Sequence, residues 1–549
     1  MINNGYLRLV EESLKKHADL PAISDYKGGT LTYAQVGERI IGIHQLYKSL
    51  HIQKGDKIAV IGRNMSNWGV VYLATVTYGA VIVPILPDFS SSDIHHIVNH
   101  SGSKVLFATD LLFDKIDEGK MPKLKGIISV NRFDVLVDLD GELTPAVEAV
   151  NVKLHGDGSG YDEKTIVFPV IEADDVAVLS YTSGTSGFSK GVLLPHRSIW
   201  SNVIFAREHL SLLQGERIVS FLPLAHSYGC LFEFLWPFVQ GCHITFLTRS
   251  PSPQIIAEAF RAVKPHLILS VPLILEKIFK RRIYPEIEQP KIKTLLKIPG
   301  IRKIVHRKIR TKLIEVFGGE FKELVIGGAA LNKNVEAFLR KIEFPFTVGY
   351  GMTECGPLIS YAPHNKTLTR SAGKIVDRME VKIDSNDPYK EVGEIMVRGD
   401  NTMLGYYKNE KATKEILDND GWLRTGDLGI INKDNFIFIK GRSKNMILGA
   451  SGQNIYPEEI EARIGTMDYV HECLVRDDNG KLEAMVYPDY EMVDAEGLNN
   501  SQLEEKMQEM KKVINKKLPA YMNIAKITLI AEEFEKTPKR SIKRYIYTK

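Results

Sequence analysis

Short apolar runs separated by longer segments of helical character dominate the first part of this chain. The runs cover residues 57–61, 79–85, 104–108, 217–221, 243–247, 266–271 and 323–326. Runs of this length that alternate with helical segments are typical of strands buried on both faces of an α/β layer. The pattern therefore predicts an α/β fold with largely parallel sheets.

The pattern changes after Ser371, where apolar runs become shorter and turns more frequent. These shorter runs cover residues 381–383, 393–397, 430–431 and 436–439. The chain has 549 residues, more than one ordinary hydrophobic core accommodates. We therefore predict a large N-terminal domain over residues 1–440 and a smaller C-terminal domain over residues 441–549.

One short segment, residues 181–192, reads YTSGTSGFSKGV and directly follows the apolar run 176–179. Glycines let backbone N–H groups approach an anion, hydroxyls add donors and a lysine adds positive charge. These residues are Thr182, Ser183, Gly184, Thr185, Ser186, Gly187 and Lys190. The segment is not a Walker A loop, because GxxxxGK[ST] cannot be laid on it. It predicts a polyphosphate site; the alternative is a flexible Gly/Ser linker, which the preceding apolar strand disfavours.

Four further clusters follow this loop. YGMTE spans residues 350–354, GWLRTGDLG spans 421–429, KGRSK spans 440–444 and GQNIYPEEIE spans 452–461. Each is weak alone, but their order and spacing resemble the adenylate-forming superfamily of acyl-CoA synthetases, peptide-synthetase adenylation domains and luciferases. The resemblance runs from residues 31–33 to Arg544, and residues 420–448 look most like a fatty acyl-CoA synthetase signature.

The resemblance implies a two-domain α/β architecture. Its N-terminal domain would consist of several subdomains of layered sheets and helices with a distorted β-barrel part. Its small α+β C-terminal domain would be a mobile lid. The implied reaction has two halves: a carboxylate reacts with ATP to give acyl-AMP and pyrophosphate, and the acyl group then passes to a thiol, usually coenzyme A.

The resemblance also implies a binding site for the phosphates of ATP. The loop from Thr182 to Lys190 would hold the β- and γ-phosphates. Thr353 resembles the residue that donates to the α-phosphate, and Glu354 resembles the carboxylate that holds Mg²⁺, a cation that prefers oxygen ligands. Thr185 would be a second ligand of the metal. A carboxylate that attacks a phosphate needs such donors and cations to offset charge repulsion.

The nucleoside side of the site follows from the same resemblance. Tyr350, followed by Gly351, looks like the aromatic residue that stacks on adenine, while Gly328 and Ala329 would line the adenine and acyl side. Asp427 matches the acid that binds the ribose hydroxyls, and Arg442 resembles a basic residue that also contacts the ribose. Each has a plain structural alternative: Tyr350 as a core aromatic, Asp427 as a turn former and Arg442 as a surface charge.

Three further positions concern the lid and the acyl group. Lys444 looks like the hinge about which the lid rotates, beside Gly441, which eases the bend. Gly452 lies in a loop resembling the part of the lid that meets coenzyme A. His226, in the motif FLPLAH, matches a histidine that borders the carboxylate pocket, with a core histidine as the alternative.

The C-terminal tail departs from the family pattern. Relatives carry a lysine that reaches the adenylating centre, in a context like Thr-Pro-x-x-Lys-x-x-Arg, and here Ser541 occupies that place. A serine supplies no positive charge. Lys539 and Lys543 flank it, and in an extended segment both side chains would point to the same side as Ser541. We expect one of the two to replace the missing lysine, with Lys543 favoured.

The acyl substrate is less constrained. Residues 226–239, HSYGCLFEFLWPFV, suit either a pocket wall for a hydrocarbon chain or a buried helix. With the fatty acyl-like signature they favour a medium- or long-chain fatty acid. Aryl acids and an acyl-carrier protein as acceptor remain open. A different class of protein, one that binds nucleotide or acyl-AMP as a regulator without adenylating, also fits the loss of the lysine at Ser541.

The remaining predictions concern partners and location. The net charge of +4 is too small to indicate a nucleic-acid partner. Nine Lys or Arg and no acid lie between Lys291 and Lys312, interleaved with apolar residues and interrupted at Pro299-Gly300. This pattern fits peripheral contact with a membrane or, alternatively, a solvated helical face. A homodimer is a further open assembly. Four scattered cysteines fit a reducing cytoplasm. Contact through the basic segment would place the protein at the inner face of the membrane.

Overall fold

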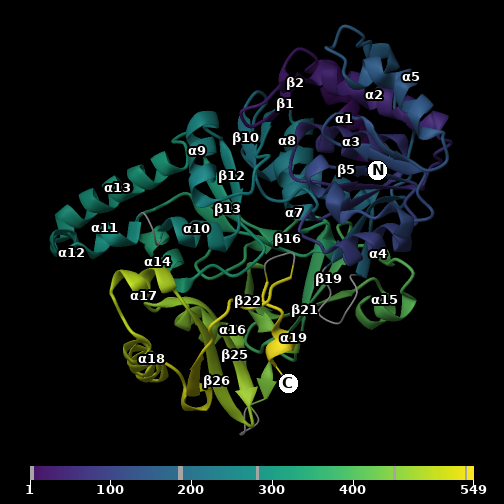
Figure 1. Ribbon diagram of the computed structural model, residues 1–549. Helices are drawn as coiled ribbons and strands as arrows, with labels where there is room; N and C mark the ends of the chain where they lie inside the picture. The colour runs from purple at the N-terminus through teal and green to yellow at the C-terminus, as the bar shows by residue number, and fades with distance from the viewer. Residues whose placement is uncertain (1–4, 183–189, 280–282, 449–452, 538–540, 549) are drawn as a thin grey trace.

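The computed structural model describes residues 5–182, 190–279, 283–448, 453–537 and 541–548 (Figure 1). Its largest sheet has the strand order β20-β9-β8-β4-β3-β5-β6-β7. The strands are β3 (Lys57–Ile61), β4 (Val81–Ile85), β5 (Val105–Ala108), β6 (Gly126–Ser129), β7 (Val135–Asp138), β8 (Val176–Thr182), β9 (Lys190–Pro195) and β20 (Gly405–Tyr406). The central strands β8, β4, β3, β5 and β6 are parallel, and the pairs at both edges are antiparallel. The parallel α/β layer predicted from the apolar runs is confirmed.

Helices cover this sheet because the segments between its strands carry helix signals. They include α1 (Gly5–Lys16), α2 (Tyr33–Ser49), α3 (Ser66–Tyr78), α4 (Ser91–Ser101), α5 (Leu143–Leu154) and α6 (His196–His209). Thr32 and Gln35 form a reciprocal capping box at the start of α2, which satisfies two backbone N–H groups there. Gly79 ends α3 with a φ of 89°, a left-handed conformation that glycine adopts without strain. These stop and start signals place β4 directly after α3.

Two smaller sheets extend the layer. One has the order β10-β11-β1-β2 and the other β12-β13-β14. Their strands are β1 (Pro21–Asp25), β2 (Thr30–Thr32), β10 (Arg217–Ser220), β11 (His243–Phe246), β12 (Leu267–Ser270), β13 (Glu323–Ile326) and β14 (Phe346–Val348). Their helices are α7 (Ser227–Gly229), η4 (Cys230–Leu235), α8 (Trp236–Val239), α9 (Pro253–Val263), α10 (Pro272–Ile278) and α14 (Lys333–Lys341). One large core joins both sheets to the main one.

An arm of three helices projects from this body, at the left of Figure 1. It comprises α11 (Tyr284–Glu288), α12 (Pro290–Lys297) and α13 (Pro299–Val316). The break expected at Pro299 is present, because α12 ends before Ile298 and α13 begins at the proline. Among the described residues, no helix combines the length and the apolar composition that crossing a bilayer requires.

Beyond residue 349 the sheets are small, as the shorter runs predict. They comprise β15 (Tyr350–Gly351), β16 (Leu358–Tyr361), β17 (Lys374–Ile375), β18 (Met379–Asp384), β19 (Gly393–Gly399), β21 (Leu423–Ile431) and β22 (Ile437–Arg442), with α15 (Glu410–Ile416) alongside. The order β18-β19-β21-β22 is antiparallel throughout. An isolated bridge from Lys374 to Phe436 connects this sheet to β17. The barrel remains a prediction.

The last segment has a hydrophobic core of its own, built from residues between Ile455 and Ile527. Its elements are β23 (Ile447–Leu448), β24 (Asn454–Ile455), α16 (Pro457–Ile464), β25 (Val470–Asp478), β26 (Lys481–Pro488), α17 (Tyr490–Ala495), α18 (Asn500–Asn515), β27 (Ile524–Leu529) and α19 (Arg544–Tyr547). Lys440 lies inside β22, which ends at Arg442. The division at residues 440 and 441 remains a prediction, and the strand end suggests a cut just after Arg442.

Candidate functional site

The phosphate-type segment connects the two strands of an antiparallel hairpin. Thr182 at the end of β8 pairs directly with Lys190 at the start of β9, and its hydroxyl donates to the Lys190 carbonyl at 3.4 Å. Ser183, Gly184, Thr185, Ser186 and Gly187 lie outside the described residues, so their roles stay predictions. The hairpin nevertheless fixes where both ends of the segment leave the sheet.

A tyrosine that we did not predict from the sequence joins two of the predicted residues. The β20 strand pairs with β9, which places Tyr406 beside the hairpin. The Lys190 ammonium lies 4.8 Å from the centroid of the Tyr406 ring, and the Tyr406 hydroxyl donates to Glu354 Oε1 at 2.8 Å. Burial, reinforced by Glu354, raises the pKa of Tyr406. A cation and a carboxylate from distant parts of the chain therefore share one aromatic side chain.

The turn that carries Thr353 and Glu354 is clamped by α6. These residues form η6 (Thr353–Cys355), which follows β15. Asn202 of α6 donates to the Cys355 carbonyl at 3.3 Å and accepts from the Leu358 N–H at 3.0 Å. Gly356 has a φ of 57°, and a Cβ there would collide with the Ser198 hydroxyl. The clamp fixes the backbone around the buried carboxyl group of Glu354.

Asp427 brings together three of the predicted nucleoside-side residues. It lies opposite Arg442 in the β21–β22 pair, and Arg442 Nε contacts Asp427 Oδ1 at 2.8 Å. The Tyr350 hydroxyl donates to Asp427 Oδ2 at 2.7 Å. Asp427 is only 5% exposed, and burial raises its pKa although Arg442 opposes the shift. The negative charges of Glu458 and Glu354 add to this rise of the pKa.

The turn former proposed as an alternative for Asp427 does not describe this arrangement, whereas the Arg442 side chain is 56% exposed and still fits the surface charge proposed as its alternative. A turn residue is usually exposed, whereas Asp427 is buried and paired on both oxygens. Tyr350 is buried and also joined to Asp427, so its core alternative and a role at the site coexist. Stacking on adenine stays a prediction. Gly351 lies in β15, directly after Tyr350.

The predicted acyl-side residues come from two segments that approach each other at Tyr228 and Gly327. His226 immediately precedes α7 and is half-buried. A Cβ on Gly327 would lie 3.0 Å from the Tyr228 ring, and Gly328 has a φ of 85°, next to Ala329. Residues 230–239 form the buried helix weighed as an alternative.

A cavity of about 20 Å³ lies beside that helix. It is lined by Tyr72, Pro84, Val178, Ser180, Leu194, Ile199, Leu224, Ala225, Ser227, Cys230, Leu231, Leu235 and Gly356. A cavity of this size holds about one water molecule.

The predicted hinge and tail residues lie in short turns and bridges of the last segment. Lys444 belongs to η7 (Ser443–Asn445), where the Ser443 hydroxyl donates to the Gly426 carbonyl at 3.1 Å. Lys543 contacts Glu535 at 3.3 Å. Ser541 lies across from Thr537, whose N–H donates to the Ser541 carbonyl at 2.8 Å. Gly452 and Lys539 lie outside the described residues.

The residues of these clusters fit Mg²⁺ and a nucleoside triphosphate. Glu354 offers a carboxylate, the hard oxygen ligand that Mg²⁺ prefers, and Tyr406 uses one of its roughly four acceptor directions. Lys190 supplies a cation at the mouth of the hairpin, and Asp427 supplies acceptors for hydroxyl donors. The arrangement combines a cationic end with an acceptor end, as a phosphorylated nucleoside requires.

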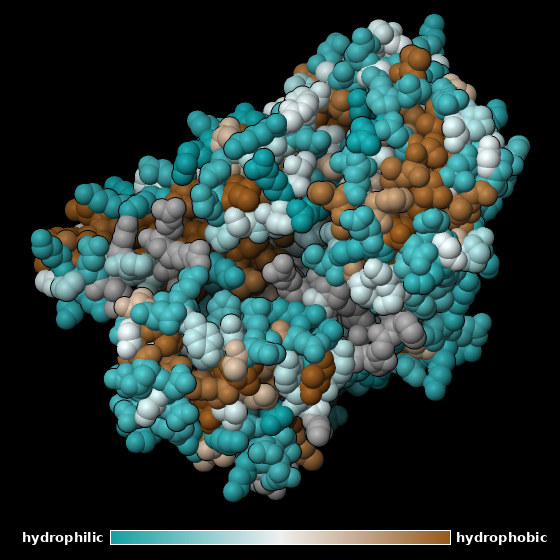
Figure 2. Space-filling model, viewed as in Figure 1, coloured by the Kyte–Doolittle hydropathy of each residue, from teal (hydrophilic) through white to brown (hydrophobic). Residues whose placement is uncertain are grey.

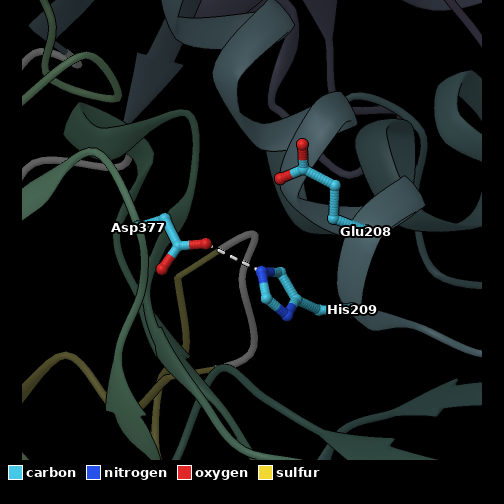
Figure 3. Close-up of side chains that lie close together, drawn as sticks. All are labelled: Glu208, His209 and Asp377. Atoms are coloured by element: carbon cyan, nitrogen blue, oxygen red, sulfur yellow. Dashed lines mark hydrogen bonds and ion pairs between the residues drawn. The ribbon is translucent and has the colours of Figure 1, made fainter.

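A second group of metal-ligand residues lies at the surface and shares no residue with this site. Figure 3 shows Glu208 and His209 at the end of α6, with His209 Nε2 2.8 Å from Asp377 Oδ2. Glu208 is already paired with Arg378 at 3.0 Å. All three side chains are exposed, and such pairs at a surface contribute little. We therefore assign no metal site to Glu208, His209 and Asp377.

Comparison with known proteins adds sequence relatives. A sequence model of a family described as AMP-binding enzyme matches residues 10–407. Long chain acyl-CoA synthetase 6, peroxisomal, of Arabidopsis thaliana is 28% identical over 515 residues, which cover 88% of this chain and 72% of that protein. A long-chain-fatty-acid–CoA ligase, FadD15, of Mycobacterium bovis is 28% identical, with 78% and 72% covered. A probable 4-coumarate–CoA ligase of Dictyostelium discoideum is 26% identical, with 75% and 72% covered.

Solved structures support the fold over the full length. The anthranilate CoA ligase AuaEII in complex with anthranoyl-AMP superposes with a TM-score of 0.80 at 17% identity, covering 100% of this chain and 97% of that one. The o-succinylbenzoate CoA synthetase of Bacillus subtilis in complex with ATP and magnesium ion gives a TM-score of 0.73 at 20% identity, with 98% of each chain covered. At these identities the match establishes the mixed α/β fold.

Proposed function

The chain belongs to the AMP-binding enzyme family, and we propose that it activates a fatty acid with ATP and transfers the acyl group to coenzyme A. It is an adenylate-forming acid–thiol ligase that uses ATP, Mg²⁺ and coenzyme A. The observation that carries the residue assignments is the pair of adjoining clusters, Lys190–Tyr406–Glu354 and Tyr350–Asp427–Arg442. One binds phosphate charge and the other binds the nucleoside.

In the first half-reaction, a carboxylate oxygen of the substrate bonds to the α-phosphorus of ATP. The bond from that phosphorus to the bridging oxygen breaks, and pyrophosphate leaves with the bonding electrons. Mg²⁺ supplies positive charge to the phosphate oxygens. Lys190 neutralises the departing pyrophosphate, and Thr353 donates to the α-phosphate. Tyr406 keeps Glu354 oriented by its hydrogen bond, so the carboxylate is held before the nucleotide arrives.

In the second half-reaction, the thiol of coenzyme A loses its proton to water and its sulfur bonds to the acyl carbon. The bond from that carbon to the phosphate oxygen breaks, and AMP leaves with the bonding electrons. We propose that the segment 441–549 rotates as a lid between the two halves. Lys444 would be the hinge, because it lies in a single short turn between β22 and the last segment. Gly452 would face coenzyme A after the rotation.

A medium- or long-chain fatty acid is the substrate we favour. The names of two relatives and the apolar lining beside α7 and η4 support it. Aryl acids are the runner-up, since a probable 4-coumarate–CoA ligase and an anthranilate CoA ligase are also similar. A carrier protein as acceptor, and a regulator that binds without adenylating, are the remaining alternatives.

The function is tested by product analysis. The protein is incubated with ATP, Mg²⁺, coenzyme A and each of a set of fatty, aryl and dicarboxylic acids, and products are identified by mass spectrometry. Acyl-CoA and AMP are expected from fatty acids, with acyl-AMP accumulating when coenzyme A is omitted. Acyl-AMP that never becomes acyl-CoA would indicate a carrier-protein acceptor. ATP binding without any acyl-AMP would favour the alternative function, a regulator that binds nucleotide without adenylating.

Replacing Asp427 by alanine is expected to raise the KM for ATP about 10- to 50-fold, because the ribose loses a charge-assisted acceptor. Initial rates at varied ATP measure this. Asp384→Ala is the matched control, because Asp384 also pairs with an arginine of the same sheet, Arg424 at 3.2 Å. An ATP KM that changes equally in both variants would remove Asp427 from the site.

A specific observation also favours contact with an anionic membrane through the projecting arm. Ile304 of α13 is 58% exposed, and Arg307 and Lys308, three and four residues further on, share its outward face. Figure 2 shows hydrophobic and hydrophilic residues side by side on this arm. An exposed isoleucine ringed by cations suits anionic lipid headgroups. With this membrane contact we propose a cytoplasmic location at the inner face of the membrane. The homodimer stays a prediction, and we assign no interface to it.

We expect Ile304→Glu to abolish sedimentation with vesicles of phosphatidylglycerol and phosphatidylcholine, because it adds an acid to the apolar contact. Wild-type protein should sediment at low salt and be released at high salt. Val152→Glu on α5 is the matched control, since Val152 is 82% exposed elsewhere. Equal binding of Ile304→Glu and wild type, or equal binding to purely neutral vesicles, would contradict the proposal.

A further inference from the structure

The turn that leads to His226 is held by two buried polar side chains. Glu233 Oε2 accepts from the N–H groups of Phe221 and Leu222 at 3.0 and 2.9 Å. Asn64, which follows β3, donates to the Leu222 carbonyl at 2.7 Å and accepts from the Leu224 N–H at 3.0 Å. Neither side chain belongs to the motif FLPLAH itself. Both bond its backbone.

Glu233 is an unusual choice for a purely structural clamp. It is 0% exposed and lies in η4, one turn of π-helix, a rare form that is frequent at functional sites. Its other oxygen, Oε1, is buried with no hydrogen-bond partner among the described residues. A carboxyl group buried this deeply costs free energy that an apolar residue would not. Burial raises the pKa of Glu233 well above its ordinary value.

The same turn is locked to the helix from its other end. The Cys230 N–H donates to the His226 carbonyl at 2.9 Å. Gly229 packs against the turn so closely that a Cβ would lie 2.9 Å from the Pro223 carbonyl oxygen. Glu233, one helical turn beyond Gly229, bonds the backbone of Phe221 and Leu222, which directly follow β10. The segment that carries His226 is therefore attached to the helix at both of its ends, and these attachments restrict the movement of His226.

We propose that Glu233 is a positioning residue for the carboxylate pocket: its carboxyl group fixes the turn from which His226 borders the substrate carboxylate. The proposal rests on the function proposed above. Glu233 does not touch the substrate. Its contribution is to keep His226 in place, and a displacement of about 1 Å in such a group can lower activity on the order of 10²-fold.

Glu233→Leu and Glu233→Gln separate this role from general stability. Leucine leaves two buried N–H groups without an acceptor, whereas the glutamine carbonyl still accepts them. In carboxylate-dependent ATP–pyrophosphate exchange, Glu233→Leu should lower kcat/KM for the carboxylate about 10²-fold with little change in the KM for ATP. Glu233→Gln should stay within about fivefold. Glu336→Leu is the matched control, because Glu336 is also buried and accepts a backbone N–H, that of Arg370.

The double variant Glu233→Leu/His226→Ala tests whether Glu233 acts through His226. If it does, the double variant loses no more activity than His226→Ala alone. Additive losses, or an equal loss in Glu336→Leu, would overturn the proposal. If the wild type shows no exchange with any carboxylate, the proposed function fails and a second measurement decides the role of Glu233.

That second measurement is the NMR spectrum of protein labelled with ¹³C in its histidine rings. The His226 signal is identified by its loss in His226→Ala. It should move in Glu233→Leu, stay in Glu233→Gln and stay in Glu336→Leu. An unmoved His226 signal in a folded Glu233→Leu variant would overturn the proposal without reference to activity.

Discussion

Replacing Lys190 by alanine is expected to slow acyl-adenylate formation about 10²- to 10³-fold, the loss typical of removing one preorganised group from a phosphoryl centre. Lys190 begins β9 at the mouth of the hairpin, and its ammonium lies 4.8 Å from the Tyr406 ring whose hydroxyl bonds Glu354. Ser541 stands where the family resemblance predicts a second lysine. We therefore expect Lys190 to carry a larger share of the positive charge at the departing pyrophosphate.

The two half-reactions separate this effect from misfolding. Lys190→Ala should lose pyrophosphate exchange but form thioester from preformed acyl-AMP at nearly the wild-type rate, because no pyrophosphate is present in that step. Lys408→Ala is the matched control, since its ammonium lies 4.8 Å from the ring of Tyr407. Equal losses in both half-reactions, or exchange retained by Lys190→Ala, would remove Lys190 from the phosphate site.

Replacing Lys543 by alanine is expected to lower adenylation about 10²-fold with little effect on thioester formation. Lys543 lies two residues beyond Ser541, and its ammonium contacts Glu535 at 3.3 Å with the side chain 30% exposed. An ion pair this exposed is weak, so the lysine can leave it for the phosphate. The double variant Lys543→Ala/Ser541→Lys should recover adenylation, because the charge returns to the position that relatives use.

Exchange assays on Lys539→Ala and Lys543→Ala decide which lysine serves. Lys536→Ala is the control, since Lys536 is held by both Glu472 and Glu533. Full exchange in both Lys539→Ala and Lys543→Ala would show that neither lysine replaces the missing one. A double variant that stays inactive after Ser541→Lys would show that the loss lies elsewhere than in the charge.

The strands of the α/β layer could be predicted from local pattern alone. The run 57–61 is β3 and the run 323–326 is β13, because each is apolar, short and buried on both faces. The break at Pro299 follows from the restricted geometry of proline. These features depend on residues close together in the chain.

The site could be predicted only where a family motif marks it. Asp427 and Arg442 come from separate motifs, and their direct pairing follows from the register of β21 and β22. Tyr406 was not predicted, because the two-residue strand β20 pairs with β9, which lies far away in the sequence, and no local pattern reveals such a pairing. Glu233 was not predicted for a different reason. A single acid in an apolar helical segment does not indicate which backbone N–H groups its carboxyl group accepts.

Carboxylate-dependent exchange of pyrophosphate into ATP, measured across a set of carboxylic acids, tests the central claim most directly. The two clusters around Glu354 and Asp427 predict exchange that needs both Mg²⁺ and a carboxylate, and the fatty acyl assignment predicts the highest rate with a medium- or long-chain fatty acid. If exchange is highest with an aryl acid, the assigned substrate changes to an aryl acid and the adenylation reaction is retained. Tight ATP binding with no exchange for any acid would contradict the account.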